Sequence, residues 1–182
     1  MTRWLLWLLG GILLGSIVHL ATVLWLPRTA TQDAYSRLQQ IAPINTVTSL
    51  PAPSPDKVLL PFMDPAFATA VCRYDLANGP LRFSMTLSQA YTAVAFYTRF
   101  GIAYYAINDR AAGRRVIQLD LMTEKQHSEM PQDVDITTAD RLIVESPTVT
   151  GLIILKALAA EPGLMPMAQE ALATARCSPP RP

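Results

Sequence analysis

Few residues in this 182-residue sequence could do acid–base or nucleophilic chemistry. His127 is the one histidine outside the apolar N-terminal run, and its polar surroundings are typical of a solvated surface. The sequence contains no G-x-S-x-G nucleophile elbow, no H-E-x-x-H pair, no P-loop and no G-x-G-x-x-G motif. We therefore expect no catalytic residue, no metal and no cofactor, and we expect that the protein is not an enzyme.

Two groups of charged and aromatic residues predict ligand binding as an alternative function. Arg110, Arg114 and Arg115 follow a predicted turn and could hold a carboxylate or phosphate through paired N–H donors. The simpler interpretation is exposed hairpin charge beside Asp109. Five tyrosines could line a cleft for an apolar or sugar ligand, but aromatic residues in strands more often pack in a core. These are Tyr74, Tyr91, Tyr97, Tyr104 and Tyr105.

The two cysteines carry a separate hypothesis. Cys72 lies in a predicted strand, and Cys177 lies at the end of a predicted C-terminal helix. A disulfide between them would close a loop of about 105 residues, which should stabilise the domain considerably. The alternative is two unrelated thiols, because free cysteines are commonly buried. We favour the disulfide, which requires an oxidising compartment, and without a nearby histidine the pair does not predict a zinc site.

An uninterrupted apolar run, residues 4–26, precedes all of these residues and contains no Asp, Glu, Lys or Arg. A bilayer core about 30 Å thick needs roughly 20 apolar helical residues, so the run is long enough to span it. Trp4, Trp7 and Trp25 lie near its ends, as expected at the headgroup level. A cleaved signal peptide has a shorter apolar region and a small-x-small site, which this segment lacks. The sequence predicts a retained, single-pass membrane anchor.

The direction of the anchor is not fixed by its flanking charges, since Arg3 precedes it and Arg28 and Arg37 follow. The predicted disulfide places the C-terminal domain in the periplasm and the anchor in the inner (cytoplasmic) membrane. Gly11, Gly15 and His19 share one face of the anchor and predict a helix-packing face. The alternative is chance, because glycine is common in membrane helices.

Composition limits the class of the soluble part. About 155 residues follow the anchor, which is enough for one ordinary domain. The sequence has 15 Lys and Arg and 14 Asp and Glu, and Arg3 precedes the anchor, so the remaining charges balance. This balance argues against nucleic acid as a partner.

The elements that position these residues follow from periodicity. Residues 31–41 predict a short amphipathic helix, and residues 43–61 contain five prolines and predict an extended linker. Period-two patterns and turn signals then predict seven strands, at residues 68–76, 81–87, 91–98, 102–107, 115–121, 141–146 and 152–159. A C-terminal helix is predicted from Pro166 through Arg176.

The predicted fold class is α+β, mainly β: an N-terminal transmembrane helix, an antiparallel β-sandwich or barrel-like meander of about seven strands, and a C-terminal helix. The expected parts are an anchor at 1–27, a juxtamembrane helix and proline-rich linker at 28–61, and a β-rich domain at 62–182.

Residues 61–159 resemble the bacterial family called domain of unknown function 1254. The segments that carry the resemblance are Asp64-Pro65, Asp75-Leu76 followed by Gly79-Pro80, and Ser146-Pro147-Thr148. The resemblance implies an exported, β-rich domain with no agreed activity and no catalytic residue to transfer. Larger members continue into a second domain of unknown function, which we expect here on a companion membrane protein docking through the anchor or the sheet.

The sequence as a whole predicts an uncharacterised bacterial envelope protein, anchored in the membrane with a periplasm-facing β domain. We expect an interaction or structural role. The alternative is a module that binds a small apolar, sugar or anionic ligand.

Overall fold

The computed structural model describes residues 2–29, 33–54, 59–60, 63–112, 115–130 and 142–180. The chain divides into two compact units, Met1–Asp33 and Ala34–Pro182. The fold is α+β and mainly β, as the sequence predicts, with an N-terminal apolar helix, two sheets and a short C-terminal helix.

The described part of the first unit contains one helix, α1 (Thr2–Thr29). Its Thr2–Leu26 segment has a mean hydropathy of 2.0, and no part of this segment is buried. A helix that is apolar on every side and exposed on every side suits hydrocarbon rather than water. Length and composition allow α1 to cross a membrane, although an N-terminal signal sequence would satisfy the same criterion.

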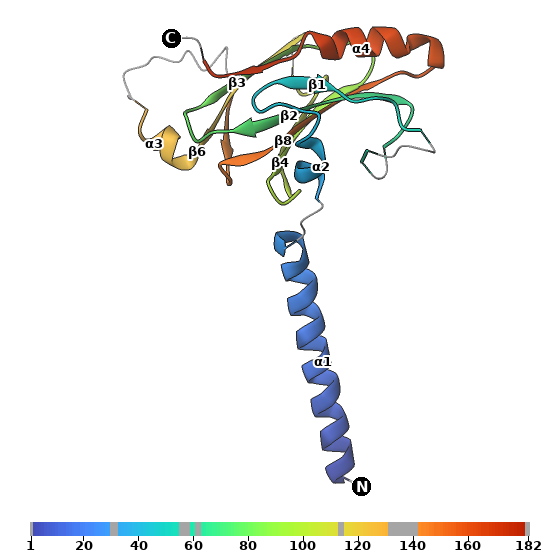
Figure 1. Ribbon diagram of the computed structural model, residues 1–182, viewed down its shortest axis with the longest axis vertical. Helices are drawn as coiled ribbons and strands as arrows, with labels where there is room; N and C mark the ends of the chain where they lie inside the picture. The colour runs from blue at the N-terminus through green and yellow to red at the C-terminus, as the bar shows by residue number, and fades with distance from the viewer. Residues whose placement is uncertain are drawn as a thin grey trace. The chain divides into compact units, whose positions relative to one another are not determined.

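The second unit contains two β-sheets (Figure 1). The five-stranded sheet is antiparallel and has the order β1-β2-β8-β4-β5. Its strands are β1 (Val47–Ser49), β2 (Phe67–Asp75), β8 (Thr150–Leu158), β4 (Thr92–Thr98) and β5 (Ala103–Asn108). The four-stranded sheet has the order β7-β6-β3-β9 and pairs β6 with β7 in parallel. Its strands are β7 (Leu142–Ser146), β6 (Val116–Thr123), β3 (Leu81–Thr86) and β9 (Arg176–Ser178).

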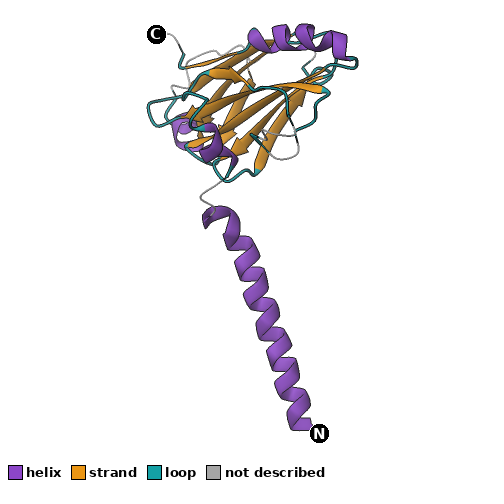
Figure 2. Ribbon diagram, turned by 45° about the vertical axis from the view of Figure 1, so that its right-hand side comes forward, coloured by secondary structure: helices purple, strands orange, loops and turns teal. Residues whose placement is uncertain are grey.

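The core lies between the two sheets, which pack face to face as a sandwich (Figure 2). Strand β3 shows the alternation that its sequence predicts, because Leu81, Phe83 and Met85 are buried while the residues between them are partly solvated. Phe83 meets Phe96 of the other sheet edge to face, with ring centroids 6.1 Å apart. Burial of these apolar side chains is the main force holding the sheets together.

Strand β2 is buried on both faces, so its sequence does not alternate. The inner face contributes Cys72 and Tyr74 to the core between the sheets. The outer face contributes Val71, which packs in a second apolar cluster with Leu38 and Leu152. Leu38 belongs to α2 (Ala34–Leu38), so this short helix covers the outer face of the five-stranded sheet.

Three further helical segments complete the described part of the β unit. Helix α3 (Glu124–Ser128) begins with a capping box formed by Thr123 and Gln126. A 3-10 turn, η1 (Pro162–Leu164), leads into α4 (Met165–Ala173). Helix α4 buries Ala168 and Leu172 and lies at the edge of the β unit away from α2 (Figures 1 and 2).

Two short strands were not expected from the sequence. Within residues 28–61, β1 pairs with β2, so this range contributes both α2 and an edge strand to the β unit. The C-terminal helix ends at Ala173 instead of continuing through Arg176, because residues 176–178 pair with β3 as β9. A three-residue strand is too short to show a period in sequence, and its partner decides its conformation.

Candidate functional site

A buried cluster of hydroxyl groups lies at one end of the sandwich, and its centre is Tyr74 of β2. The Tyr74 Oη lies 2.9 Å from the Ser146 Oγ and 3.2 Å from the Tyr104 Oη. It is also 3.2 Å from the backbone carbonyl oxygen of Tyr97. Gly151 faces Tyr74 across the β2–β8 ladder and leaves the space that the phenol ring fills. Four strands from both sheets therefore meet at one buried phenol.

The cluster continues into the turn between β7 and β8. The Ser146 Oγ donates to the carbonyl of Thr148 at 2.7 Å, and the Thr148 Oγ1 donates to the carbonyl of Thr150 at 2.8 Å. The backbone N–H of Arg99 donates to the Thr148 Oγ1 at 3.4 Å. The Ser146-Pro147-Thr148 segment thus joins the turn after β4 to the turn before β8 through side-chain hydroxyls.

The chemistry of this cluster is that of neutral hydroxyl groups. Burial raises the pKa of Tyr104 well above its ordinary value of 10.0, so the phenol stays protonated at neutral pH. A serine nucleophile needs an adjacent base. The side chain of Ser146 contacts the phenols of Tyr74 and Tyr104 and the backbone of Thr148. The arrangement joins strands of both sheets at one end of the sandwich through side-chain hydroxyl groups.

This burial predicts a loss of stability at alkaline pH. Below about pH 10 both folded and unfolded Tyr104 are protonated, so its contribution is constant. As the pH rises from about 10 towards the raised folded pKa, the unfolded chain releases the proton first and stability falls, by at most about 1.4 kcal/mol per pH unit. Tyr104→Phe should therefore flatten the decline in the urea midpoint above pH 10. Tyr91→Phe, at an exposed phenol, should leave the decline unchanged, and equal profiles for all three proteins would contradict the assignment.

Cation–π contacts join α2 to the five-stranded sheet. The Tyr35 ring has the guanidinium carbon of Arg73 4.5 Å from its centroid and that of Arg99 4.4 Å from it. Arg73 is only 5% exposed, and its Nη1 donates to the carbonyl of Ala42 at 3.0 Å. Its Nε is the buried side-chain polar atom, among the described residues, without a hydrogen-bond partner. The Tyr35 ring and the backbone carbonyls therefore compensate for the burial of this charge.

Arg73→Ala should loosen α2 from the sheet. We expect the free energy of unfolding to fall by about 2 kcal/mol, because the carbonyl of Ala42 loses its buried donor and the Tyr35 ring loses one cation. Amide exchange over residues 34–42 should accelerate more than exchange in β3. Arg176→Ala is the matched control, since Arg176 also donates to backbone carbonyls but is exposed. Equal effects of the two substitutions would show that burial of Arg73 is unimportant.

The predicted cysteine pair is joined in the structure. Cys72 of β2 and Cys177 of β9 form a disulfide, with their Cα atoms 6.5 Å apart. Both side chains lie in the core between the sheets, so the bond ties one sheet to the other. The sequence placed Cys177 at a helix end, whereas the structure places it on a strand.

The other predicted site residues are dispersed. The side chains of Arg110 and Arg115 are exposed, and Arg114 lies outside the described residues, so the anion-binding group remains a prediction. Gly11, Gly15 and His19 are exposed on α1. His127 is exposed as expected, and its Nδ1 lies 2.5 Å from a carboxylate oxygen of Glu145.

The five tyrosines do not line one cleft. Tyr74, Tyr104 and Tyr105 pack with the core between the sheets, whereas Tyr97 belongs to the cluster on the outer face. Tyr91 is exposed and packs its ring edge against Phe67 at the other end of β2. Sequence reasoning did not single out Arg73 or Gly151, and for Ser146 the only signal was the Ser-Pro-Thr segment.

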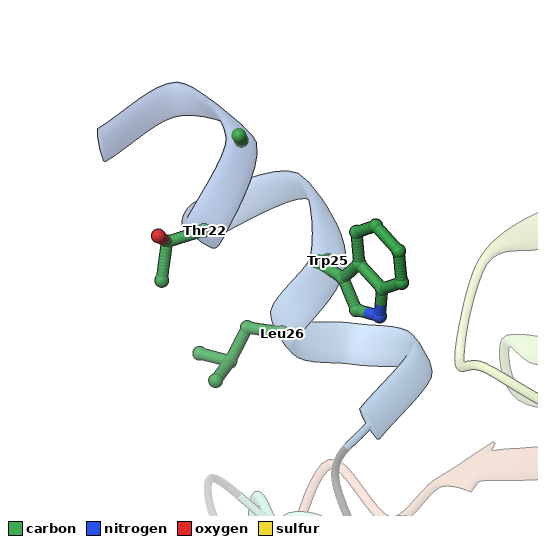
Figure 3. Close-up of a pocket in the computed structure, with 4 residues that line it drawn as sticks. Thr22, Trp25 and Leu26 are labelled. Atoms are coloured by element: carbon green, nitrogen blue, oxygen red, sulfur yellow. The ribbon is translucent and has the colours of Figure 1, made fainter. Parts of the chain in front are cut away.

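Two hollows formed by described residues bear on the question of a ligand. A hollow of about 340 Å³ beside α1 is lined by Ala21, Thr22, Trp25 and Leu26, which all belong to one helix and so enclose nothing (Figure 3). A second cavity, lined by residues of α4, β2 and the segment after β1, measures about 30 Å³, roughly the volume of one water molecule. Within the described ranges, no three His, Cys, Asp or Glu side chains are grouped to hold a metal ion.

Two solved bacterial proteins are similar in structure to this chain. The VPA0106 protein from Vibrio parahaemolyticus has a crystal structure similar to this chain, with a TM-score of 0.58 and 14% identity, covering 80% of this chain and 34% of that one. A putative uncharacterized protein from Burkholderia cenocepacia gives a TM-score of 0.48 and 11% identity, covering 74% and 34%. The chain thus spans about a third of the length of either protein.

Sequence comparison identifies the family. Among curated proteins no sequence matches this chain. Residues 44–179 match the family model described as protein of unknown function (DUF1254), and this match covers nearly all of the β unit. The chain therefore belongs to the DUF1254 family of proteins of unknown function.

Proposed function

We propose that this protein is an interaction or structural component of the bacterial envelope, without enzymatic activity, and that α1 anchors it in the cytoplasmic membrane. The observation that carries the proposal is α1 itself. Its 25-residue Thr2–Leu26 segment has the length and hydropathy of a membrane span, and its apolar side chains are exposed. Exposing so many large apolar side chains to water would be unfavourable, whereas hydrocarbon accommodates them.

The disulfide supports a periplasmic location for the β unit. A bond between Cys72 and Cys177 persists in an oxidising compartment and is rare in the reducing cytoplasm. The interaction role, rather than ligand binding, is supported by the dispersal of the predicted tyrosine site and by the small size of the cavity lined by α4 and β2.

Fractionation and a topology reporter test the anchoring together. The full chain, expressed in a Gram-negative host, should stay in the membrane pellet after an alkaline carbonate wash. A C-terminal alkaline phosphatase fusion should be active, and a matching green fluorescent protein fusion exported through the same pathway should be dark. Recovery of soluble protein lacking the first thirty or so residues would overturn the anchor, and a bright fluorescent fusion would reverse the direction.

A companion membrane protein is the partner that we propose for the face formed by Gly11, Gly15 and His19. No neighbouring atom lies within 4 Å of the Cβ position at either glycine, so another helix can approach closely there. Gly15→Ile should sharply reduce crosslinking of the anchor to its partner in native membranes. Gly10→Ile, the same change about 140° away from Gly15 around the helix, should not. Unchanged crosslinking in the Gly15→Ile protein would argue against this face.

A further inference from the structure

Large apolar side chains are exposed at the end of the sandwich that carries the hydroxyl cluster. In the described part of the β unit, four of the ten exposed large apolar residues lie there: Ile44, Phe100, Ile102 and Val149. We call these four residues the turn edge. Phe100 and Ile102 flank Gly101 in the β4–β5 turn, and Ile102 is 60% exposed. Exposed large apolar residues that gather at one place, rather than singly, mark a candidate contact surface.

Hydrogen bonds hold these segments at one end of the sheet. The backbone N–H of Arg99, next to Phe100, donates to Thr148, next to Val149. The carbonyl of Val149 accepts from the N–H of Leu76, just beyond the end of β2. Ile44 forms an isolated bridge with Arg73, near the same end of β2. The turn edge is therefore a defined part of the fold.

The turn edge lies beside the start of α2. The Nη2 of Arg99 donates to the Ser36 Oγ at 3.3 Å, and the Arg99 guanidinium stacks on Tyr35. Figure 1 shows α2 next to the β4–β5 turn. Ser36 is two residues after Ala34, where the β unit begins. The chain from α1 therefore enters the β unit within a few residues of the turn edge.

Chain length limits how far the turn edge can lie from the anchor. Only residues 30–33 separate Thr29, the end of α1, from Ala34, the start of α2. The five Cα–Cα steps from Thr29 to Ala34 span at most about 18 Å when the chain is fully extended. The nine residues of β2 extend about 30 Å, so this connection is shorter than the sheet is long. If α1 crosses a membrane, this end of the β unit stays within reach of the lipid headgroups. This step rests on the proposed anchoring function.

We propose that the turn edge is a second membrane contact, in which Phe100 and Ile102 insert into the headgroup region of the bilayer that α1 crosses. The occupant of this surface is lipid. The exposed residues are apolar, so burial of apolar surface drives the contact. The contact should therefore persist at high salt, which screens attraction between charges.

Fluorescence quenching in the full chain tests the proposal. Three single variants, Ile102→Cys, Met167→Cys and Ile12→Cys, receive an environment-sensitive fluorophore while the native disulfide stays oxidised. Met167 is the matched control, because it is an apolar residue 58% exposed on α4 at the opposite edge. The proteins are reconstituted in vesicles of phosphatidylethanolamine and phosphatidylglycerol, with or without brominated lipid. Far-ultraviolet circular dichroism checks that each labelled protein is folded.

At positions 102 and 12, the fluorophore should emit at a shorter wavelength than at position 167. Brominated lipid should remove most of the intensity at positions 102 and 12 and leave the intensity at position 167 unchanged. Quenching at 12 but not at 102 would overturn the membrane contact and leave the anchor intact. Absence of quenching at 12 would instead remove the proposed anchoring function and this inference with it. If the fluorophore at position 102 shows the blue shift in native membranes but not in vesicles of pure lipid, a protein and not lipid covers the turn edge. That result would also overturn the proposal.

A second experiment tests the lipid contact without a label at position 102. With the fluorophore at Val149→Cys, quenching should be lost when Phe100→Asp is added, because a carboxylate enters the headgroup region less readily than a phenyl ring. Tyr91→Asp, at an exposed aromatic residue away from the turn edge, should leave the quenching unchanged. Equal quenching in all three proteins would contradict the contact.

Discussion

Replacing both cysteines, in a Cys72→Ala/Cys177→Ala variant, should lower the free energy of unfolding of the β unit by about 4 kcal/mol. The cysteines are 105 residues apart, and closing so long a loop removes much of the conformational entropy of the unfolded chain. The bond also joins β2 of one sheet to β9 of the other. Urea unfolding of the full chain in detergent, followed by near-ultraviolet circular dichroism of the buried tyrosines, would measure the change.

The reducing agent itself provides the control for this experiment. Reductant should lower the stability of the wild-type protein to that of the double variant and leave the variant unchanged. If the oxidised, reduced and substituted proteins all unfold at the same urea concentration, the bond does not stabilise the fold.

Gly151→Ala should destabilise the β unit by about 3 kcal/mol, because a methyl group there has no room. Its Cβ would overlap the Oη of Tyr74 and the backbone carbonyl oxygen of Tyr97. The carbonyl belongs to β4, which is paired with β8, so it cannot move aside without breaking the ladder. Displacing Tyr74 would separate its Oη from Ser146 and from the carbonyl of Tyr97, so the buried phenol would lose hydrogen bonds.

Gly163→Ala is the matched control for this substitution. Gly163 has open space at its Cβ position, so the change should alter stability by no more than about 0.5 kcal/mol. Adding Tyr74→Phe to Gly151→Ala should recover part of the loss, since the phenol oxygen is one of the overlapping atoms. Equal stability of the two alanine variants would show that the close approach at Gly151 is relieved at no cost.

Local pattern was sufficient for the longer strands. The alternation of Leu81, Phe83 and Met85 predicts β3, and the structure buries these three side chains. Each strand of five or more residues was expected within a few residues of its bounds, because half-buried strands repeat every two residues and turn residues mark the ends of apolar runs. The short strands β1 and β9 depend on partners distant in sequence, so nothing in their own residues signals them.

The candidate site was much less accessible to sequence reasoning. Tyr74 and Ser146 are 72 residues apart and belong to different sheets, and their contact depends on the strand order β1-β2-β8-β4-β5 beside β7-β6-β3-β9. Arg73 looked like an ordinary strand residue, whereas α2 covers it and the Tyr35 ring packs on it. The pairing of Cys72 with Cys177 was accessible, because a chain with two cysteines has only one pairing.

The sequence by itself determined the apolar helix, the mainly β fold class and the longer strands, since each depends on local composition or short-range periodicity. The family followed from the resemblance of short segments to known members. The tertiary structure alone decided which strands pair, that Tyr74 meets Ser146, and that Arg99, next to Phe100, contacts the start of α2. The physical reason is that these contacts join residues far apart in the chain. Packing of whole sheets selects such contacts, and no local preference encodes them.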